Sequence, residues 1–223
     1  KPAKQTQATK DARKILIDSL RDGAQIPQPT ATRCSAEITD EEIQRTMENV
    51  PLGKSAGPDR LPNAFYRALA IIVAPRLTEV LNEAREKGEL PNDLRKGLIS
   101  VLYKKRDRTD PRNYRPITLL NGDYKIFTRV LTKRMNAAVL EFVSDPQNGF
   151  VPHGFIAENT LLIKLLMAHM DETDEDGNKA EALMVFLDME KAFDKVSFDY
   201  VREALPALGF TPVRSAASSA RAR

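Results

Sequence analysis

The chain has 223 residues, of which 42% are hydrophobic, so it can bury a substantial core. Its single cysteine, Cys34, excludes an intramolecular disulfide framework and, with only two histidines, a structural zinc site, as expected for a nuclear or cytoplasmic protein. No apolar run approaches the roughly 20 residues of a membrane-spanning helix, so no membrane partner is expected.

The net charge of +3 conceals two blocks of opposite sign. Over residues 95–134 twelve Lys and Arg face three Asp, whereas over residues 171–199 ten acidic residues face three lysines. A basic block followed by an acidic block is typical of a surface for a polyanion next to a metal site. Two solvated faces that differ in charge are the alternative interpretation.

Hydrophobic periodicity predicts a mixture of helices and strands. The polar segment 1–10 is expected to be disordered, and 24–33 is expected to be a linker. In chain order, the predicted helices cover residues 11–20, 40–49, 64–74, 76–87, 123–142, 161–170 and 198–208. The predicted strands cover residues 97–105, 117–120 and 183–187.

Several helix ends are marked by specific residues. Thr39 and Glu42 have the spacing of a capping box, in which each side chain accepts a hydrogen bond from the other residue's backbone. Pro75 is expected to break one helix from the next, and Gly88 to end the second of them. Ser197 is expected to be the N-cap of the last helix.

The segment 51–62, PLGKSAGPDRLP, is a loop rich in glycine and proline that carries Lys54 and Arg60. Its glycines could let backbone amides approach a phosphate. It is not a Walker loop, because the Gly-Lys-Ser/Thr ending is absent at the required spacing. A plain connecting loop is the alternative for this segment taken alone.

The predicted helix 123–142 carries a basic stripe. Lys125, Arg129 and Lys133 recur every four residues, which places them on one face. A face of this kind suits contact with nucleic acid, and ordinary solvation is the alternative.

The segment LMVFLDMEKAFDKV, residues 183–196, carries the strongest signal of chemistry. The apolar run 183–187 predicts a buried strand that ends at Asp188. A carboxylate that leaves the core there needs a cation, and Mg²⁺ is commonly bound by one or two carboxylates together with substrate phosphates. Phosphoryl transfer follows as a hypothesis. An Asp that only caps the following helix is the alternative.

Four stretches together resemble the reverse transcriptases of non-LTR retrotransposons. They are, in order, KSAGPDRLPNAFY (54–66), NYRPITLLNGDYKIFTRVLTKR (113–134, with Lys104 before it), QNGFVP with ENT (147–160), and FLDMEKAFDKV (186–196). The ordered set spans about residues 38–210 and is far more specific than any one of its members.

This resemblance implies an α+β fold of the right-hand polymerase type, with mostly helical fingers and an incomplete palm. It implies fingers over 38–180 and the start of the palm over 181–210. Residues 1–37 are then an N-terminal extension and linker, and residues 211–223 a disordered tail outside the family.

The resemblance also implies roles for individual residues. Asp188 matches the first catalytic, metal-binding aspartate, and Phe193 matches the aromatic residue that excludes the ribose 2′-hydroxyl. Lys104 and Arg115 match residues that bind the incoming triphosphate. Nucleic-acid contacts are implied for Lys54 and Arg60, in addition to Lys125, Arg129 and Lys133. The implied cofactor is Mg²⁺ or Mn²⁺, and the implied partners are an RNA template, a DNA primer and a dNTP.

Two departures from the family pattern bear on activity. His153-Gly154 stands where the family has Gly-Arg, and no aromatic-x-Asp-Asp motif occurs in the sequence. The chain by itself is therefore expected to be inactive, and a non-catalytic nucleic-acid-binding remnant is one alternative. A metal-dependent phosphohydrolase is a second alternative, disfavoured because Glu190 and Ala192 stand where that chemistry requires Asp and Thr or Val.

Overall fold

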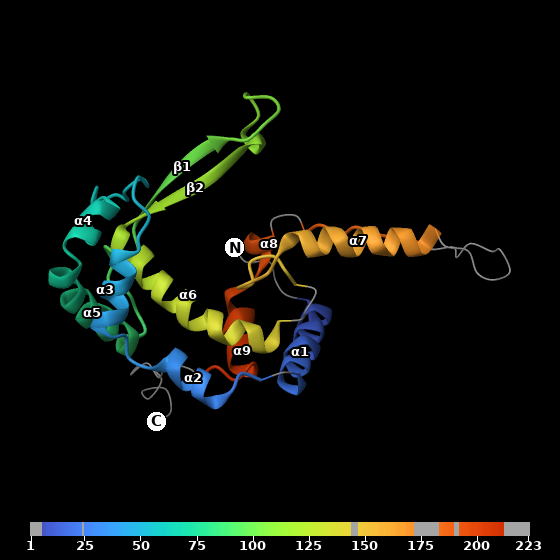
Figure 1. Ribbon diagram of the computed structural model, residues 1–223, viewed down its shortest axis with the longest axis horizontal. Coiled ribbons are helices and arrows are strands. Elements are labelled where there is room, and N and C mark those ends of the chain that lie inside the picture. Colours follow the sequence, from blue (N-terminus) through green and yellow to red (C-terminus); the bar gives the residue numbers. More distant parts are fainter. Residues whose placement is uncertain (1–5, 24, 144–146, 172–182, 190–191, 212–223) are drawn as a thin grey trace. The chain divides into compact units, whose positions relative to one another are not determined.

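A computed structural model describes residues 6–23, 25–143, 147–171, 183–189 and 192–211. These residues are mostly helical and include a two-stranded antiparallel sheet (Figure 1). They divide into two compact units. The first joins the residues before 32 to 136–210, and the second is built from 32–135.

The secondary-structure elements account for most of the described residues. The helices are α1 (Gln7–Asp22), α2 (Gln28–Ser35), α3 (Asp40–Glu48), α4 (Asn63–Ala68), α5 (Ala70–Lys87), α6 (Gly122–Phe142), α7 (Ile156–Asp171), α8 (Ala192–Lys195) and α9 (Phe198–Ala207). The strands are β1 (Gly97–Tyr103) and β2 (Tyr114–Leu120), with the short 3-10 helix η1 (Pro111–Asn113) between them. In this part of the chain, no helix is both long and apolar enough to cross a membrane.

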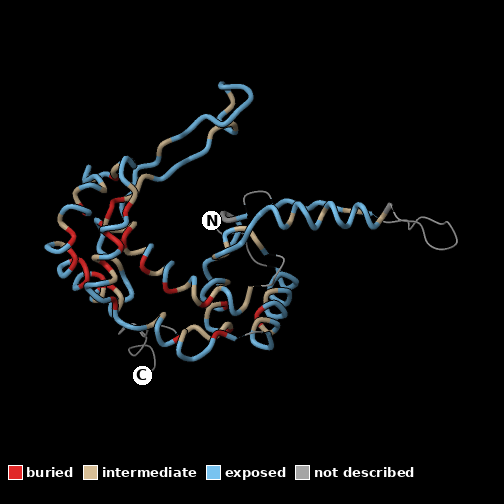
Figure 2. Tube along the Cα trace, in the orientation of Figure 1, coloured by how far each residue is buried: buried red, intermediate tan, exposed pale blue. Residues whose placement is uncertain are grey.

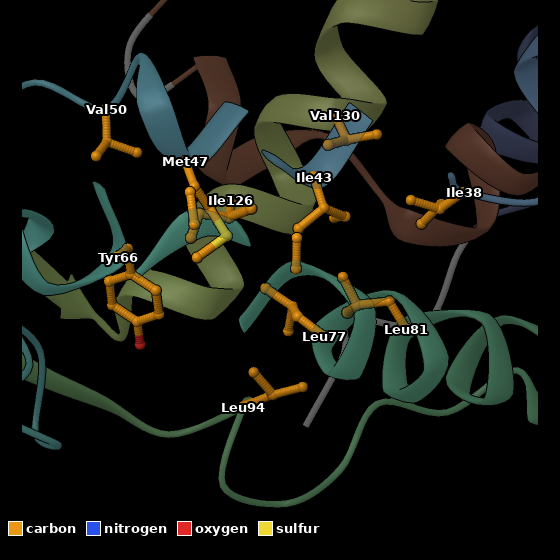
Figure 3. Close-up of a cluster of buried hydrophobic side chains, with 12 residues drawn as sticks. Ile38, Ile43, Met47, Val50, Tyr66, Leu77, Leu81, Leu94, Ile126 and Val130 are labelled. Atoms are coloured by element: carbon orange, nitrogen blue, oxygen red, sulfur yellow. The ribbon is translucent and has the colours of Figure 1, made fainter. Parts of the chain in front are cut away.

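The second unit is organised around a core between α3, α4, α5 and the first half of α6. Figure 2 shows the buried residues gathered on these helices, and Figure 3 shows their side chains directed toward one another. Removing this much apolar surface from water is the main favourable contribution to folding. The buried apolar side chains are Ile38, Ile43, Met47, Val50, Tyr66, Ala70, Ala74, Leu77, Leu81, Leu94, Ile126 and Val130.

The predicted ends of the helices in this unit are partly confirmed. The capping box is present, since Glu42 N donates to Thr39 Oγ1 (3.3 Å) and Thr39 N donates to a Glu42 carboxylate oxygen (3.1 Å). Gly88 ends α5 with φ 69°, a left-handed conformation that favours glycine. The predicted break at Pro75 is wrong, because α5 continues through it. Pro75 removes only the bond to the Ile71 carbonyl, and Ile71 is exposed, so water can replace that bond.

The sheet is a hairpin whose register fixes which side chains share a face. The predicted strands 97–105 and 117–120 are confirmed, although β1 ends two residues earlier than expected, at Tyr103, and β2 begins three residues earlier, at Tyr114. Leu102 lies opposite Arg115, and Tyr103 lies opposite Tyr114. Side chains on both faces of the hairpin are largely exposed.

The first unit pairs α1 with α9. Ile17 packs against Ala204 and Ala207, and Arg13 forms an ion pair of 2.7 Å with Glu203. Ser197 caps α9 as predicted, because its side chain accepts a hydrogen bond from the backbone nitrogen three residues later.

Three other predictions differ from the structure. The segment 24–33, expected to be a linker, contains most of α2, whose Pro29 lies in the first turn, where a missing N–H costs little. Helix α1 begins at Gln7, inside the segment expected to be disordered, and α7 begins at Ile156 rather than near residue 161. The predicted buried strand 183–187 is wrong.

Residues 183–189 have no regular secondary structure. Leu183 is 88% exposed and Leu187 91% exposed. The physical reason is that a strand needs a neighbour to complete its hydrogen bonds. Within the described ranges, the ladder joins β1 to β2 alone.

Candidate nucleic-acid interface

The β1–β2 hairpin brings Lys104 and Arg115 to one face. Leu102 and Arg115 are opposite in the register, and Lys104 follows Leu102 by two residues, so the three residues share a face. Lys104 N donates to Asn113 O (2.9 Å), which continues the ladder beyond the last strand pair. Both cationic residues are exposed. The hairpin therefore presents two adjacent positive charges to solvent.

The opposite face of the hairpin is aromatic at the same level. The rings of Tyr103 and Tyr114 meet edge to face with centroids 5.7 Å apart. The guanidinium of Arg108 lies 4.9 Å from the centre of the Tyr103 ring, within the range of a cation–π contact. These contacts stiffen the end of the hairpin that carries Lys104.

The loop 51–62 carries the exposed residues Lys54 and Arg60, and its backbone is fixed by side chains. Asn63 Nδ2 donates to Pro51 O (2.7 Å), and Leu61 N donates to a carboxylate oxygen of Asp59 (3.0 Å). Arg60 itself has φ 61°, an unusual conformation for a residue other than glycine. A loop held in this way presents its two cations in a defined arrangement.

Asp59, in the loop 51–62, forms a partly buried cluster with Tyr66 and Asp123. The Tyr66 hydroxyl oxygen lies 3.5 Å from a carboxylate oxygen of Asp59. Burial, aided by the charge of Asp59, raises the pKa of the Asp123 carboxyl group above its ordinary value. Burial and the charges of Asp123 and Asp59 raise the pKa of the Tyr66 hydroxyl well above its usual range. The hydroxyl thus stays protonated and can donate to the carboxylate.

The basic stripe on α6 divides into residues with different surroundings. Lys125 Nζ donates to Ser55 O (3.4 Å), which brings this cation to the loop that carries Lys54. Lys133 Nζ donates to the hydroxyl of buried Thr46 (3.1 Å). Arg129, between them, is exposed. The stripe is therefore partly structural, which its spacing in the sequence did not indicate.

Two residues of this unit have roles that the sequence analysis missed. The buried guanidinium of Arg134 binds Glu42 and two backbone carbonyls. Asn121 is buried between β2 and α6, and its side-chain oxygen accepts a hydrogen bond from Asp59 N (3.2 Å). For Asn121, the sequence signal that could have indicated this role is its position between a predicted strand and a predicted helix, where an Asn side chain often hydrogen-bonds to nearby backbone groups.

The predicted metal site is not assembled by the described residues. Asp188 is exposed within 183–189, and no group of three His, Cys, Asp or Glu among the described residues could hold a metal ion. Phe193 belongs to α8, but its side chain lies outside what the structure describes. Among the residues that the structure describes, no second carboxylate therefore joins Asp188, and the roles of Asp188 and Phe193 remain predictions.

The departure at His153-Gly154 has a structural counterpart. His153 has φ 66°. A Cβ atom at Gly154 would lie 2.3 Å from Asn148 O, so the loop backbone passes too close for any other residue at that position.

Comparison with known proteins places these features in a family. Residues 103–219 match the family model described as "Reverse transcriptase (RNA-dependent DNA polymerase)", a match that continues past Phe210, where the sequence resemblance was taken to end. The chain is 33% identical over 180 residues to "Transposon TX1 uncharacterized 149 kDa protein" of Xenopus laevis, covering 81% of this chain and 13% of that protein.

Two proteins of Drosophila melanogaster are also similar. "Probable RNA-directed DNA polymerase from transposon BS" is 29% identical, covering 86% of this chain and 20% of that protein. "RNA-directed DNA polymerase from mobile element jockey" is 28% identical, covering 71% of this chain and 17% of that protein. The chain thus spans one fifth or less of the length of these relatives.

Proposed function

This chain belongs to the reverse transcriptase (RNA-dependent DNA polymerase) family and is related to the polymerases of non-LTR retrotransposons, and from that premise we propose that it forms the fingers and the start of the palm of such a polymerase. Residues 38–180 are the fingers and 181–210 begin the palm. The observation that carries the proposal is the hairpin that holds Lys104 and Arg115, both among the matched residues 103–219, on one exposed face.

The reaction served by this surface is attack of a primer 3′-hydroxyl on the α-phosphate of a dNTP, directed by an RNA template. Lys104 and Arg115 bind the triphosphate of the incoming nucleotide. Arg115 offers a planar fork that matches two phosphate oxygens at once, whereas Lys104 acts as a mobile point charge. Residues opposite or diagonal on one face of a hairpin lie roughly 5–8 Å apart, which suits two contacts to one triphosphate.

The nucleic acid lies on the basic surface formed by the loop 51–62 and α6. Lys54 and Arg60 are exposed on a braced loop, and Lys125 joins them through its bond to Ser55 O. Neutralising phosphates with such residues releases counterions, so affinity falls steeply with salt. This contact is independent of base sequence, as a template-directed polymerase requires.

The catalytic centre needs more than the described residues supply. The family implies use of a divalent metal ion, and Asp188 is our candidate for its first carboxylate ligand. Phe193, five residues later, is the candidate for excluding the ribose hydroxyl. Because no aromatic-x-Asp-Asp motif occurs in the sequence, we expect this chain alone to bind substrates without extending a primer. Family membership leaves the phosphohydrolase alternative without support.

The test is binding of a primed RNA template to the chain, with and without the dNTP that is complementary to the next template base. Arg115→Ala should remove the gain in affinity that the dNTP gives, and should weaken binding of the primed template itself by less than about threefold, as expected when one contact among many is lost. Arg112→Ala is the matched control, because Arg112 lies in the short helix η1 before β2 and its side chain is 90% exposed. Equal effects of the two variants would favour the non-catalytic nucleic-acid-binding remnant.

A further inference from the structure

Asn121 joins three separate segments of the second unit through one buried amide. The residue is 7% exposed. Its side-chain oxygen accepts from Asp59 N (3.2 Å), and its side-chain nitrogen donates to Asp93 O (3.4 Å). A buried amide that satisfies groups on two other segments resists displacement of either segment, since each lost bond leaves a polar group unpaired.

The three segments are those that carry the proposed substrate contacts. Asp59 belongs to the loop 51–62, which presents Lys54 and Arg60. Asp93 lies in the turn that leads into β1, and Asn121 directly follows β2. Both strands of the hairpin therefore leave the folded core at the Asn121 amide, and the loop is attached to the same point.

The packing around Asn121 leaves no room for the loop to move inward. A Cβ atom on Gly57 would lie 2.4 Å from the Asn121 side-chain oxygen and 2.5 Å from Asn121 N. The loop backbone thus rests directly on Asn121. Arg60 N donates to Gly57 O (3.0 Å), so the position of Arg60 follows from that of Gly57.

We propose that Asn121 is a positioning residue, which fixes the loop 51–62 against the base of the β1–β2 hairpin so that the two sets of cations contact one bound complex of primed template and dNTP together. One set is Lys54 and Arg60, and the other is Lys104 and Arg115. The proposal rests on the proposed function for the identity of the ligand, but not for the structural link, which is a property of the free chain.

The first measurement is hydrogen exchange of the unliganded chain. Asn121→Ala should speed exchange of the Asp59 amide about tenfold, the change expected when one net hydrogen bond is lost. Gly57→Ala should do the same by displacing the loop while Asn121 is intact. The matched control is Asn82→Ala, which removes a part-buried side-chain amide that bonds both the N and the O of Ile38 (2.9 and 2.8 Å) in the same unit and contacts neither Asp59 nor Asp93 through a hydrogen bond. If Asp59 exchanges equally in the control and in both variants, the proposal is overturned.

The second measurement is the coupling between the two sets of cations in binding primed RNA template in the presence of the complementary dNTP. The loop pair and the hairpin pair are replaced by Ala separately and together. In the parent chain, the fold-loss in affinity of the combined variant should differ from the product of the two separate fold-losses by about fivefold or more, as for coupled contacts. In Asn121→Ala the combined fold-loss in affinity should equal the product of the separate ones, which means that the coupling is gone. In Asn82→Ala the coupling should persist.

The two measurements separate the possible failures. A parent chain that binds no primed template refutes the proposed function, while the exchange result still decides the role of Asn121. Coupling that survives in both Asn121→Ala and Gly57→Ala refutes the positioning role even if binding is normal. If Asn121→Ala does not fold, Gly57→Ala provides the same comparison.

Discussion

Replacing Arg134 by Met removes a buried guanidinium while it keeps a flexible apolar chain that fills much of the same space. The Arg134 side chain is 7% exposed. Its nitrogens donate to both carboxylate oxygens of Glu42 and to the carbonyls of Ala36 (2.6 Å) and Glu37 (2.7 Å). One side chain thereby ties α6 to the N-terminus of α3 and to the segment that precedes it.

The expected cost follows from what the substitution leaves behind. Removing one partner of a buried ion pair typically destabilises a protein by about 3–5 kcal/mol, because the other charge remains without a partner. Glu42 is one-third exposed, and Ala36 and Glu37 are exposed, so water can partly replace the lost bonds. We therefore expect a loss of about 3 kcal/mol in the free energy of unfolding, the lower end of that range.

The assay is urea denaturation followed by far-ultraviolet circular dichroism. The dependence of the free energy of unfolding on urea concentration is compared between variants, because an unchanged slope means that a shifted midpoint reports stability. Arg76→Met is the control, because Arg76 is 85% exposed and its pair with Glu79 is an ordinary surface pair. Arg134→Lys should lie between the parent and Arg134→Met, since an ammonium cannot bind several acceptors as a planar fork does. If Arg134→Met costs no more than Arg76→Met, the guanidinium does not hold these segments together.

The same structure makes two further predictions. Hydrogen bonding from Arg134 lowers the pKa of Glu42, so the stability from this pair is present above the unfolded pKa of Glu42 and is lost as the pH falls through the lower folded pKa. Urea titrations across acidic pH should show this loss in the parent chain, and Arg134→Met should show less of it. Arg129→Glu should weaken nucleic-acid binding without changing the denaturation midpoint, whereas Lys133→Glu should lower both, because Lys133 bonds buried Thr46. Equal midpoints for these two variants would contradict the structural role of Lys133.

The features that the sequence predicted correctly depend on short-range interactions. The capping box of Thr39 and Glu42, the left-handed Gly88 and the N-cap Ser197 each involve residues within one turn, so local chemistry determines them. The two strands of the β1–β2 hairpin were likewise predicted from their apolar and β-branched composition, but their antiparallel pairing was not.

The features that were missed depend on partners distant in the chain. Arg134 and Asn121 look unremarkable in the sequence, because their hydrogen-bond partners lie far away in the chain, at Glu42 for Arg134 and at Asp59 and Asp93 for Asn121. The run 183–187 has the composition of a buried strand, but composition does not supply a neighbouring strand. Pro75 was expected to end a helix, yet α5 continues through it. The hydrogen bond that Pro75 cannot donate to the Ile71 carbonyl costs little, because Ile71 is exposed and water can bind its carbonyl instead.

Hydrogen exchange of the chain with primed RNA template and complementary dNTP tests the central claim most directly, because it maps the contact surface without requiring catalysis. We predict protection of the loop 51–62 on adding the template, and further protection of the hairpin around Lys104 and Arg115 on adding the dNTP. Helices α1 and α9 should be unchanged. Protection confined to α1 and α9, or none on the hairpin when dNTP is added, would contradict the assignment of this chain as the nucleotide-binding fingers of a polymerase.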